Sequence, residues 1–327
     1  MKAVVLKEYG SPDGFEVTEV EKPGLKDNGV LIKVHAATVS AGDTEVRKLS
    51  FPIYLMLPIR IYLGILRPRK LILGQEIAGV IEAVGQDVTT FNVGDAVFGT
   101  TGMGFGGYAE YKSLPAQSED GILARKPADL SFEEAAALCI GGLESSYYLK
   151  KANIQPGERV LIVGAGGSIG SLGVQLAKHM GAEVTAVDST GKLDMLRELG
   201  ADHVIDFTQE AYPQPGQTYD VVFDVIGKSP FGKCVQALNP KGRYLLANPS
   251  LSQALRGSWI AATSDKSFVY GPVSQTPEDM AYIIDLVEAG HLKLVIDKVF
   301  PLEQAADAHH YFETGQKKGN IIIRVAD

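Results

Sequence analysis

The chain has 327 residues, of which 45% are hydrophobic, and its 39 acidic and 31 basic side chains leave a formal net charge of −8 at pH 7. This length and apolar content favour two domains with sizeable cores, and the acidic balance argues against nucleic acid as a partner because like charges repel. Only two cysteines occur, Cys139 and Cys234. The sequence therefore offers no disulfide framework, which is typical of a reducing compartment, and we expect a cytoplasmic protein.

Short strands and glycine turns are expected throughout the first 123 residues. The predicted strands span residues 1–9, 29–40, 77–85 and 94–99. The alternation of apolar and polar residues in VLIKVHA and the turn signal NVGD predict a small, mostly antiparallel β-barrel. The N-terminal stretch MKAVVLKEYG is expected to form a strand rather than a signal segment.

The most apolar stretch runs from Phe51 to Leu66 and is interrupted by two prolines, an arginine and a glycine. It is shorter than the roughly 20 residues that a membrane-spanning helix needs, so no membrane insertion is expected. We expect it to belong to a folded lobe. It either packs into the core or forms the wall or lid of an apolar pocket, and both interpretations are compatible with the sequence.

A change of pattern follows. Ser131, with Glu134 three residues later, predicts the start of a helix through a capping box. Beyond it, apolar strands over 159–165, 183–188, 203–207, 219–227, 242–248 and 267–273 alternate with helical segments over 170–181 and 192–200. This alternation predicts a parallel sheet with helices on both faces.

The C-terminal tail has helical patterns over 277–290 and 302–315 and strand patterns over 296–300 and 320–325. We assign this tail to the first domain. The predicted domains are therefore residues 1–123 with 272–327, and an inserted domain of residues 124–271.

The strongest chemical signal is the segment VLIVGAGGSIGSLGVQLAK, in which four glycines stand where a strand turns into a helix. Glycines allow a tight turn and let a pyrophosphate approach the helix N-terminus, where free N–H groups and the helix dipole favour anions. An acidic residue, Asp188, ends the next predicted strand. Together these features predict a dinucleotide-binding site.

The choice of dinucleotide stays open at this point. Asp188 can accept hydrogen bonds from the adenosine ribose and would repel a 2′-phosphate, which favours NAD. Ser189, Thr190 and Lys192 follow it and offer groups that can hold this phosphate, which favours NADP.

Five motifs in this order and spacing, GQEIAGVIEAVG, NVGDAVFG, VLIVGAGGSIGSLGVQLAK, GADHVIDF and YDVVFDVIG, resemble the medium-chain dehydrogenase/reductase superfamily, and within it the zinc-free quinone oxidoreductase and enone reductase branch. The resemblance implies an α/β protein with a GroES-like, mostly antiparallel β-barrel domain and a Rossmann domain with a doubly wound parallel sheet. It places NADP or NAD between the domains, slightly favours NADP, and implies a homodimer through the edge strand at 267–273.

The resemblance also bears on metal binding. The positions of the catalytic zinc ligands in zinc-containing relatives correspond to Ser40, Gln75 and Gly141, which are poor or impossible zinc ligands. Cys139 lies two residues from the third position and is expected in the core. We therefore expect no catalytic and no structural zinc.

The resemblance implies catalytic roles for Ser40, Asp43 and Gln75. Two pocket tyrosines of relatives are replaced by Glu45 and Phe51. Tyr54 and Tyr62 of the apolar stretch can supply hydroxyl donors instead, and Tyr54 is the candidate catalytic residue. The expected cofactor contacts are Ser145, Gly164, Gly166, Gly167, Ser168, Ile169, Gly170, Asp188, Ser189, Lys192, Val225, Ile226, Gly227, Ala247, Asn248 and Asn320. Alternatively, Asp43 only organises its own loop and Ser40 only satisfies a backbone group.

These features predict a zinc-independent, NAD(P)H-dependent oxidoreductase that transfers hydride to a quinone or an α,β-unsaturated carbonyl. Without a Lewis acid an alcohol is hard to oxidise, whereas hydrogen-bond donors suffice to stabilise the oxyanion of an activated acceptor. An NAD(P)-dependent alcohol or aldehyde dehydrogenase is the enzyme alternative. A non-catalytic NAD(P)H-binding protein with an interaction or redox-sensing role is the other.

Overall fold

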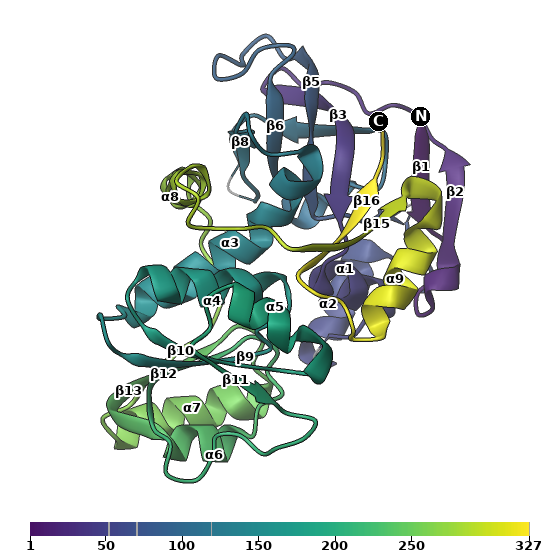
Figure 1. The fold of residues 1–327 in the computed structure, drawn as a ribbon. Helices are drawn as coiled ribbons and strands as arrows, with labels where there is room; N and C mark the ends of the chain where they lie inside the picture. Colours follow the sequence, from purple (N-terminus) through teal and green to yellow (C-terminus); the bar gives the residue numbers. More distant parts are fainter. Residues whose placement is uncertain (52, 70, 119, 327) are drawn as a thin grey trace. The chain divides into compact units, whose positions relative to one another are not determined.

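The computed structural model describes residues 1–51, 53–69, 71–118 and 120–326, with only the backbone of residues 53–55. The chain forms two compact units (Figure 1): unit 1 comprises Met1–Cys139 with Ile296–Asp327, and unit 2 comprises Ile140–Val295.

The predicted domain boundaries, 123/124 and 271/272, lie earlier in the chain than the bounds of these units. One reason lies at the start of helix α3 (Phe132–Ala152), where the Phe132 ring stacks on His35 of unit 1 at 4.4 Å. The other lies in helix α8 (Pro277–Glu288), where Asp279 pairs with Lys150 of unit 2 at 2.9 Å. The helical segment at 277–290 therefore belongs to unit 2 rather than to the tail.

Unit 1 is built on a seven-stranded sheet with the order β15-β16-β3-β5-β6-β8, and β7 also pairs with β3. The β15 and β16 pair is parallel, and the other pairs of this sheet are antiparallel. A three-stranded sheet, β2-β1-β4, accompanies it. The strands are β1 Lys2–Leu6, β2 Phe15–Glu19, β3 Gly29–Thr38, β4 Leu71–Ile72, β5 Glu76–Val84, β6 Ala96–Thr100, β7 Tyr111–Pro115, β8 Leu123–Arg125, β15 Ile296–Pro301 and β16 Asn320–Arg324.

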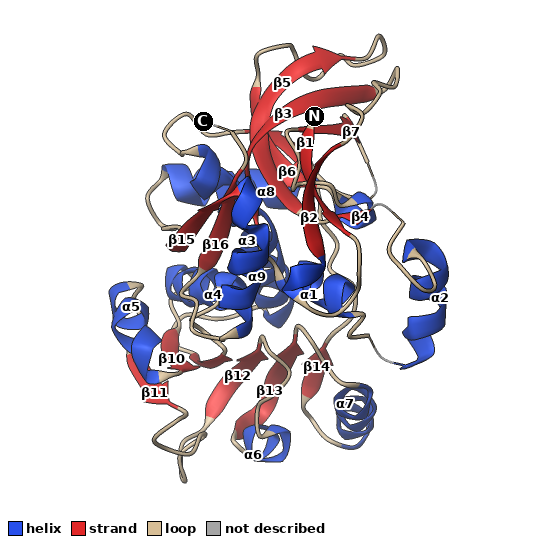
Figure 2. Ribbon diagram, turned by 90° about the vertical axis from the view of Figure 1, so that its right-hand side faces the viewer, coloured by secondary structure: helices blue, strands red, loops and turns tan. Residues whose placement is uncertain are grey.

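Strands β3 and β5 run side by side through unit 1 (Figure 2) and supply many of its buried apolar side chains. Candidate site residues lie at one end of each strand. Ser40 lies between the end of β3 and the start of α1, and Gln75 directly precedes β5. The helices of this unit are α1 Ala41–Lys48, α2 Ile53–Leu63 and α9 Ala305–Glu313, together with the first turns of α3.

Unit 2 contains a six-stranded, fully parallel sheet with the order β11-β10-β9-β12-β13-β14. Helices α4 and α5 lie on one face of this sheet, and α6 and α7 on the other (Figures 1 and 2). The strands are β9 Arg159–Val163, β10 Glu183–Asp188, β11 His203–Asp206, β12 Tyr219–Asp224, β13 Leu238–Leu246 and β14 Ser267–Val269. The helices are α4 Ser168–His179, α5 Leu193–Glu198, α6 Phe231–Gln236 and α7 Leu251–Thr263, with α8 and the rest of α3.

This strand order reverses between β9 and β12. In open parallel sheets such a switch point is where ligands bind, outside the carboxyl ends of the strands. The doubly wound sheet predicted from the alternating pattern is thus confirmed, and its switch point brings the glycine turn after β9 beside the loop after β12.

Local signals located most elements correctly. Ser131 caps α3 with the predicted capping box, because its hydroxyl accepts from Glu134 N at 3.1 Å and the Glu134 carboxylate accepts from Ser131 N at 2.9 Å. Helices α1, α2, α6 and α7 had not been predicted. In the part of the chain that the structure describes, no helix has both the length and the apolarity to cross a membrane.

Candidate active site

The glycine turn of unit 2 connects β9 to α4 and needs glycine for two separate reasons. Gly164 has φ +78°, a left-handed conformation that side chains disfavour. A Cβ atom at Gly170 would come within 2.3 Å of the Gly164 carbonyl oxygen. Both positions therefore allow α4 to approach the end of β9 closely.

The start of α4 is built to meet an anion. Its N-cap is Gly167, which has no side chain to cap the helix. A Cβ atom at Gly167 would find only the Gly164 carbonyl oxygen, at 3.8 Å, so the space above it is open. The first N–H groups of the helix, from Ser168 and Ile169 onward, have no capping side chain, and a pyrophosphate fits this arrangement.

Asp188, at the end of β10, is turned toward the glycine turn. One carboxylate oxygen accepts a hydrogen bond from Gly166 N at 2.7 Å. The other accepts from Ser189 N at 2.9 Å and pairs with Lys192 Nζ at 3.1 Å. Both partners of the ion pair are buried, so the negative charge of Asp188 is compensated inside the protein.

The Lys192 stem also lies across the glycine turn. A Cβ atom at Gly166 would come within 2.4 Å of Lys192 Cδ. The structure thus brings together Gly166, Asp188, Ser189 and Lys192. The sequence predicts that these residues belong to one site, but their contacts with one another are seen only in the structure.

The loops after β12 and β13 form the other side of the switch point. Gly227 has φ +64°, and a Cβ atom there would come within 1.9 Å of the Asn248 carbonyl oxygen. Asn248 Nδ2 donates to the Val225 carbonyl at 2.9 Å, and Ala247 N donates to Asp224 O at 3.1 Å. The side chain of Ile226 lies over Gly164, where an added Cβ atom would meet Ile226 Cγ2 at 2.6 Å.

Ser145 and Asn320, two of the expected cofactor contacts, are both buried. Ser145 is fully buried in α3, and its hydroxyl lies 2.6 Å from both the Gly141 and the Ile169 carbonyl oxygens. It therefore fastens α3 to the start of α4. Asn320 is the first residue of β16 in unit 1 and is buried.

In unit 1, three predicted catalytic residues come together at the start of α1. Ser40 is the N-cap: its hydroxyl accepts from Asp43 N at 3.1 Å and donates to Asp43 Oδ2 at 2.7 Å. It also lies 3.3 Å from Gln75 Oε1. A Cβ atom at Gly42 would overlap Gln75 Oε1 at 2.2 Å, so this glycine lets the amide rest on the helix.

Asp43 joins the loop before β5 to α1. Its side chain is completely buried, and Oδ1 accepts a hydrogen bond from Gly74 N at 2.8 Å. Burial raises the pKa of Asp43 to about 6, although hydrogen bonds from Ser40, Gly74 and Gln75 oppose this shift. These hydrogen bonds hold the loop before β5 against the start of α1, and a catalytic role for Asp43 stays a prediction.

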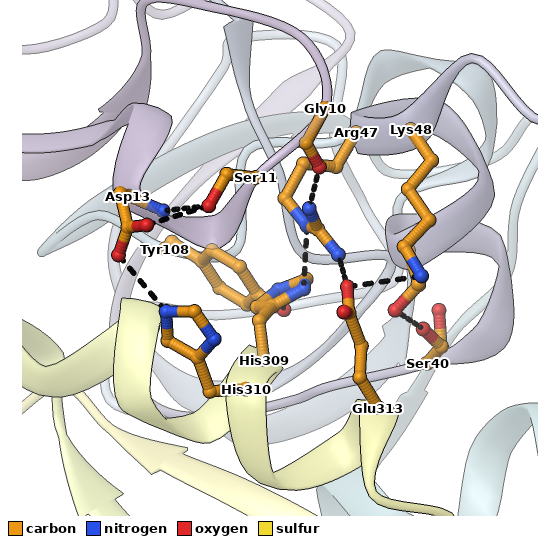
Figure 3. A network of polar contacts seen from close by, with 11 residues as sticks. Gly10, Ser11, Asp13, Ser40, Arg47, Lys48, Tyr108, His309, His310 and Glu313 are labelled. Carbon is orange, nitrogen blue, oxygen red and sulfur yellow. Dashed lines mark hydrogen bonds and ion pairs between the residues drawn. The ribbon is translucent and has the colours of Figure 1, made fainter.

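A buried polar network supports this cluster (Figure 3). Arg47 of α1 is fully buried and donates to the Gly10 carbonyl, to Glu313 of α9, and to His309 Nδ1 at 3.3 Å. His309 Nε2 lies 3.1 Å from the Tyr108 hydroxyl, which in turn donates to the Thr38 carbonyl at 3.1 Å.

The chemistry of arginine fixes the direction of this chain. A guanidinium only donates, so His309 Nδ1 must accept and the ring proton sits on Nε2. Nε2–H then donates to the Tyr108 oxygen, and the hydroxyl proton of Tyr108 goes to Thr38 O. Burial and the charge of Arg47 lower the pKa of His309 to about 3, which keeps this tautomer neutral.

Tyr108 holds both segments that deliver the candidate catalytic residues. Its hydroxyl binds Thr38, two residues before Ser40, and its backbone N–H donates to the Leu73 carbonyl at 2.9 Å, two residues before Gln75. Thr38 Oγ1 also donates to the buried Glu76 carboxylate. The spacing of Ser40 and Gln75 thus depends on residues far away in the sequence.

The residues at the expected metal positions do not fit zinc. Ser40 contributes a hydroxyl already bound to Asp43, Gln75 contributes an amide, and Gly141 has no side chain. Cys139 is fully buried with Sγ 3.7 Å from the Ala135 carbonyl, and burial raises the pKa of its thiol. Within the described ranges, no group of three His, Cys, Asp or Glu side chains is placed to hold a metal ion.

One predicted catalytic side chain cannot be placed. Tyr54 belongs to α2, but its side chain lies outside the described residues. Glu45 and Phe51, which replace the pocket tyrosines of relatives, are both half-buried, and burial raises the pKa of Glu45.

Sequence reasoning did not find the residues that hold the site residues in position: Thr38, Glu76, Tyr108, Asp224, His309 and Gln253, whose Nε2 donates to Gly227 O at 3.0 Å. Asp224 gave a usable signal, since it is a charge inside the apolar run YDVVFDVIG. It is fully buried and accepts from Gly227 N at 2.8 Å and Ser229 Oγ at 2.5 Å, which shapes the turn after β12. Nothing in the spacing around His309 indicates its partner 201 residues away.

A parallel sheet with this strand order and a glycine turn after its first strand is typical of proteins that bind a dinucleotide. Residues 26–124 match the alcohol dehydrogenase GroES-like domain family, and residues 199–323 match a zinc-binding dehydrogenase family. The chain belongs to the medium-chain dehydrogenase/reductase superfamily.

Individual relatives lie in the predicted branch. The chain is 32% identical to a 2-methylene-furan-3-one reductase of Solanum lycopersicum and 30% identical to a chloroplastic NADPH-dependent alkenal/one oxidoreductase of Arabidopsis thaliana. Each match covers 99% of this chain and 79% of the relative. A solved quinone oxidoreductase of Coxiella burnetii superposes with a TM-score of 0.89 at 27% identity, over 100% of this chain and 99% of the other. The predicted superfamily and fold class are confirmed.

Proposed function

We propose that this oxidoreductase uses NAD(P)H to reduce a quinone or an α,β-unsaturated carbonyl without zinc. The observation that carries the proposal is the set of contacts made by the side-chain amide of Gln75. Its amide lies 3.3 Å from the Ser40 hydroxyl and rests on Gly42, and no hydrogen bond joins its amide nitrogen to a residue that the structure describes. The cluster thus offers an amide, which can donate an N–H group, where a zinc enzyme would need a thiolate or imidazole.

This donor suits one kind of chemistry. The nicotinamide, when bound, supplies a hydride to the acceptor carbon. The electron pair displaced by the hydride moves onto the carbonyl oxygen, and the Gln75 N–H stabilises the resulting negative charge. A proton from solvent then completes the reduced product. Ser40 and Asp43 keep the amide in place, because the Ser40 hydroxyl is bound to the Asp43 carboxylate and lies 3.3 Å from the Gln75 amide.

The glycine turn and the Asp188–Lys192 pair support NAD(P)H as the cofactor, and one relative is named for NADPH. A quinone or an enone is the proposed acceptor because several relatives carry these substrates in their names. The match to a zinc-binding dehydrogenase family speaks for the dehydrogenase alternative, but the donor set at Ser40 and Gln75 speaks against it.

The test is a substrate panel with the chelator-free protein: a quinone, an enone and an aldehyde, each with NADPH and NADH. We expect loss of nicotinamide absorbance with the quinone or the enone and no tightly held zinc by metal analysis. Zinc-dependent aldehyde reduction would establish the alcohol dehydrogenase alternative. Cofactor binding without turnover of any acceptor would establish the non-catalytic one.

Gln75→Leu tests the assigned donor. Removing one oxyanion donor is expected to lower kcat by about a hundredfold while cofactor affinity stays unchanged. Gln86→Leu, an exposed glutamine after β5, is the matched control and should leave kcat unchanged. An unchanged kcat in Gln75→Leu would remove this residue from the mechanism.

A further inference from the structure

Helix α2 of unit 1 is apolar on two opposite faces. On its inner face, Leu63 is 5% exposed and Ile59 packs against the core of unit 1. On its outer face, Leu57, Ile61 and Tyr62 are 66%, 54% and 61% exposed. A helix at a protein surface normally shows water a polar face, so an apolar outer face needs a partner.

More exposed apolar side chains follow the helix in the sequence, and positively charged residues come directly after them. Ile65 is 54% and Leu66 is 89% exposed. Arg67 and Arg69 follow, are exposed, and form no ion pair with any residue that the structure describes. The sequence from residue 51 to residue 70 contains no aspartate or glutamate, although the whole chain carries a net charge of −8.

We propose that this α2 surface, formed by Leu57, Ile61, Tyr62, Ile65, Leu66, Arg67 and Arg69, docks on the surface of an anionic lipid bilayer. The apolar side chains would enter the headgroup and acyl boundary, and the arginines would meet lipid phosphates. With 11 residues, α2 is too short to span a bilayer, so the attachment is peripheral. Such docking would serve the proposed function, on which it rests, because quinones and long-chain enones dissolve in membranes.

Charge argues against a second copy of the chain as the partner. In a twofold contact a second copy would offer this surface only the same residues, and the segment has no acidic residue to pair with Arg67 or Arg69. An anionic bilayer offers the complementary charge.

Helix α7 provides a matched control. Its residues Leu251, Leu255 and Trp259 form an exposed apolar stripe and are 54%, 63% and 68% exposed. The cation of this helix, Arg256, is already placed over the Phe231 ring at 4.8 Å. The α7 stripe thus matches the apolar character of the α2 surface but lacks its uncommitted cations.

The experiment is co-sedimentation of the full chain with vesicles of phosphatidylcholine alone and with phosphatidylglycerol added. We expect binding that is more than tenfold tighter to the anionic vesicles. Arg67→Gln with Arg69→Gln should weaken this binding more than tenfold, and Leu57→Ser with Leu66→Ser should abolish it. Leu255→Ser with Trp259→Ser should change nothing. Each variant is first shown to keep the Tm of the unchanged protein.

Equal binding by the unchanged chain and the α2 variants, or no vesicle binding at all, would overturn the proposal. So would a dimer that the Leu66→Ser variant dissociates, because a second copy would then cover the surface. Enone reduction in vesicle-free buffer is measured separately. If the protein binds vesicles but reduces no acceptor, the docking proposal stands and the proposed function is wrong.

Discussion

Because the carboxyl group of Asp43 is buried, the stability of the fold is expected to depend on pH through this residue. Its pKa is raised to about 6, whereas the unfolded chain releases this proton near 3.8. A raised pKa means that ionisation of Asp43 costs more free energy in the folded state. The protonated carboxyl group therefore contributes its full stabilisation below pH 4, and this stabilisation is lost as pH rises through 6. The full effect is about 3 kcal/mol.

We therefore expect Asp43→Asn to lack this loss of stability between pH 4 and pH 7, as measured by denaturant unfolding at several pH values. Its absolute stability should be lower throughout, since the amide nitrogen faces the N–H groups that the carboxylate accepts. The same pH dependence in Asp43→Asn and the unchanged protein would show that Asp43 does not titrate in this range.

We expect Lys192 to determine the affinity for NADPH relative to NADH, because these cofactors differ in the 2′-phosphate. In the structure its charge compensates Asp188 at 3.1 Å, so the carboxylate repels this phosphate less than an unpaired one would. Lys192→Gln should leave Asp188 uncompensated and weaken NADPH binding about tenfold more than NADH binding. Asp188→Asn should shift the preference in the opposite direction.

Fluorescence titration with both cofactors measures this preference. A parallel loss of both affinities in Lys192→Gln would mean that the residue only shapes the glycine turn, where its stem crosses Gly166.

At the scale of elements, α1 and α9 are joined through His309. Burial lowers the pKa of His309 to about 3, while the unfolded chain takes up this proton near 6.5. The neutral ring therefore stabilises the fold fully above pH 6.5, and this stability is lost as pH falls toward 3. The upper limit of the effect is about 5 kcal/mol.

We expect His309→Gln to be less stable than the unchanged protein at pH 7.5 and to lose less additional stability at pH 5. The adjacent His310 is the control, because it is exposed and bonded to Asp13 at 2.9 Å. His310→Gln should keep the acid sensitivity of the unchanged protein. If both variants behave alike in denaturant titrations at the two pH values, the buried ring is not the acid-sensitive group.

Elements were predictable where the signals were local. Ser131 and Glu134 located α3, and the apolar runs located the strands of unit 2. The helices at α2 and α7 were missed because their apolar residues do not fall on a single face, and some of them remain exposed in the fold. Helix α1 was missed because Ser40 and Asp43 were assigned catalytic or loop-ordering roles, whereas they cap this helix.

At the scale of the whole molecule, the assembly state is still a prediction. Strand β14 forms the edge of the parallel sheet and pairs only with β13 among the strands that the structure describes. An unpaired edge can accept the same strand of a second copy, which would join the two sheets.

We expect a homodimer by sedimentation, and Val269→Pro should dissociate it because proline removes an edge N–H group and bends the strand. Cofactor titration and Tm show whether the separated chain remains folded. A folded Val269→Pro variant of unchanged mass would contradict assembly through this edge.

The sequence by itself determined the alternation of strands and helices in unit 2, the glycine turn, the capped helix and the type of donor at residues 40 and 75. These depend on neighbouring residues, because dihedral limits, helix caps and strand alternation act within a few positions. Only the tertiary structure decided that Asp188 is compensated by Lys192, that Asp43 is buried against Gly74, and that His309 supports Tyr108. Charge compensation and desolvation depend on which distant segments meet, and the folded chain alone fixes those contacts.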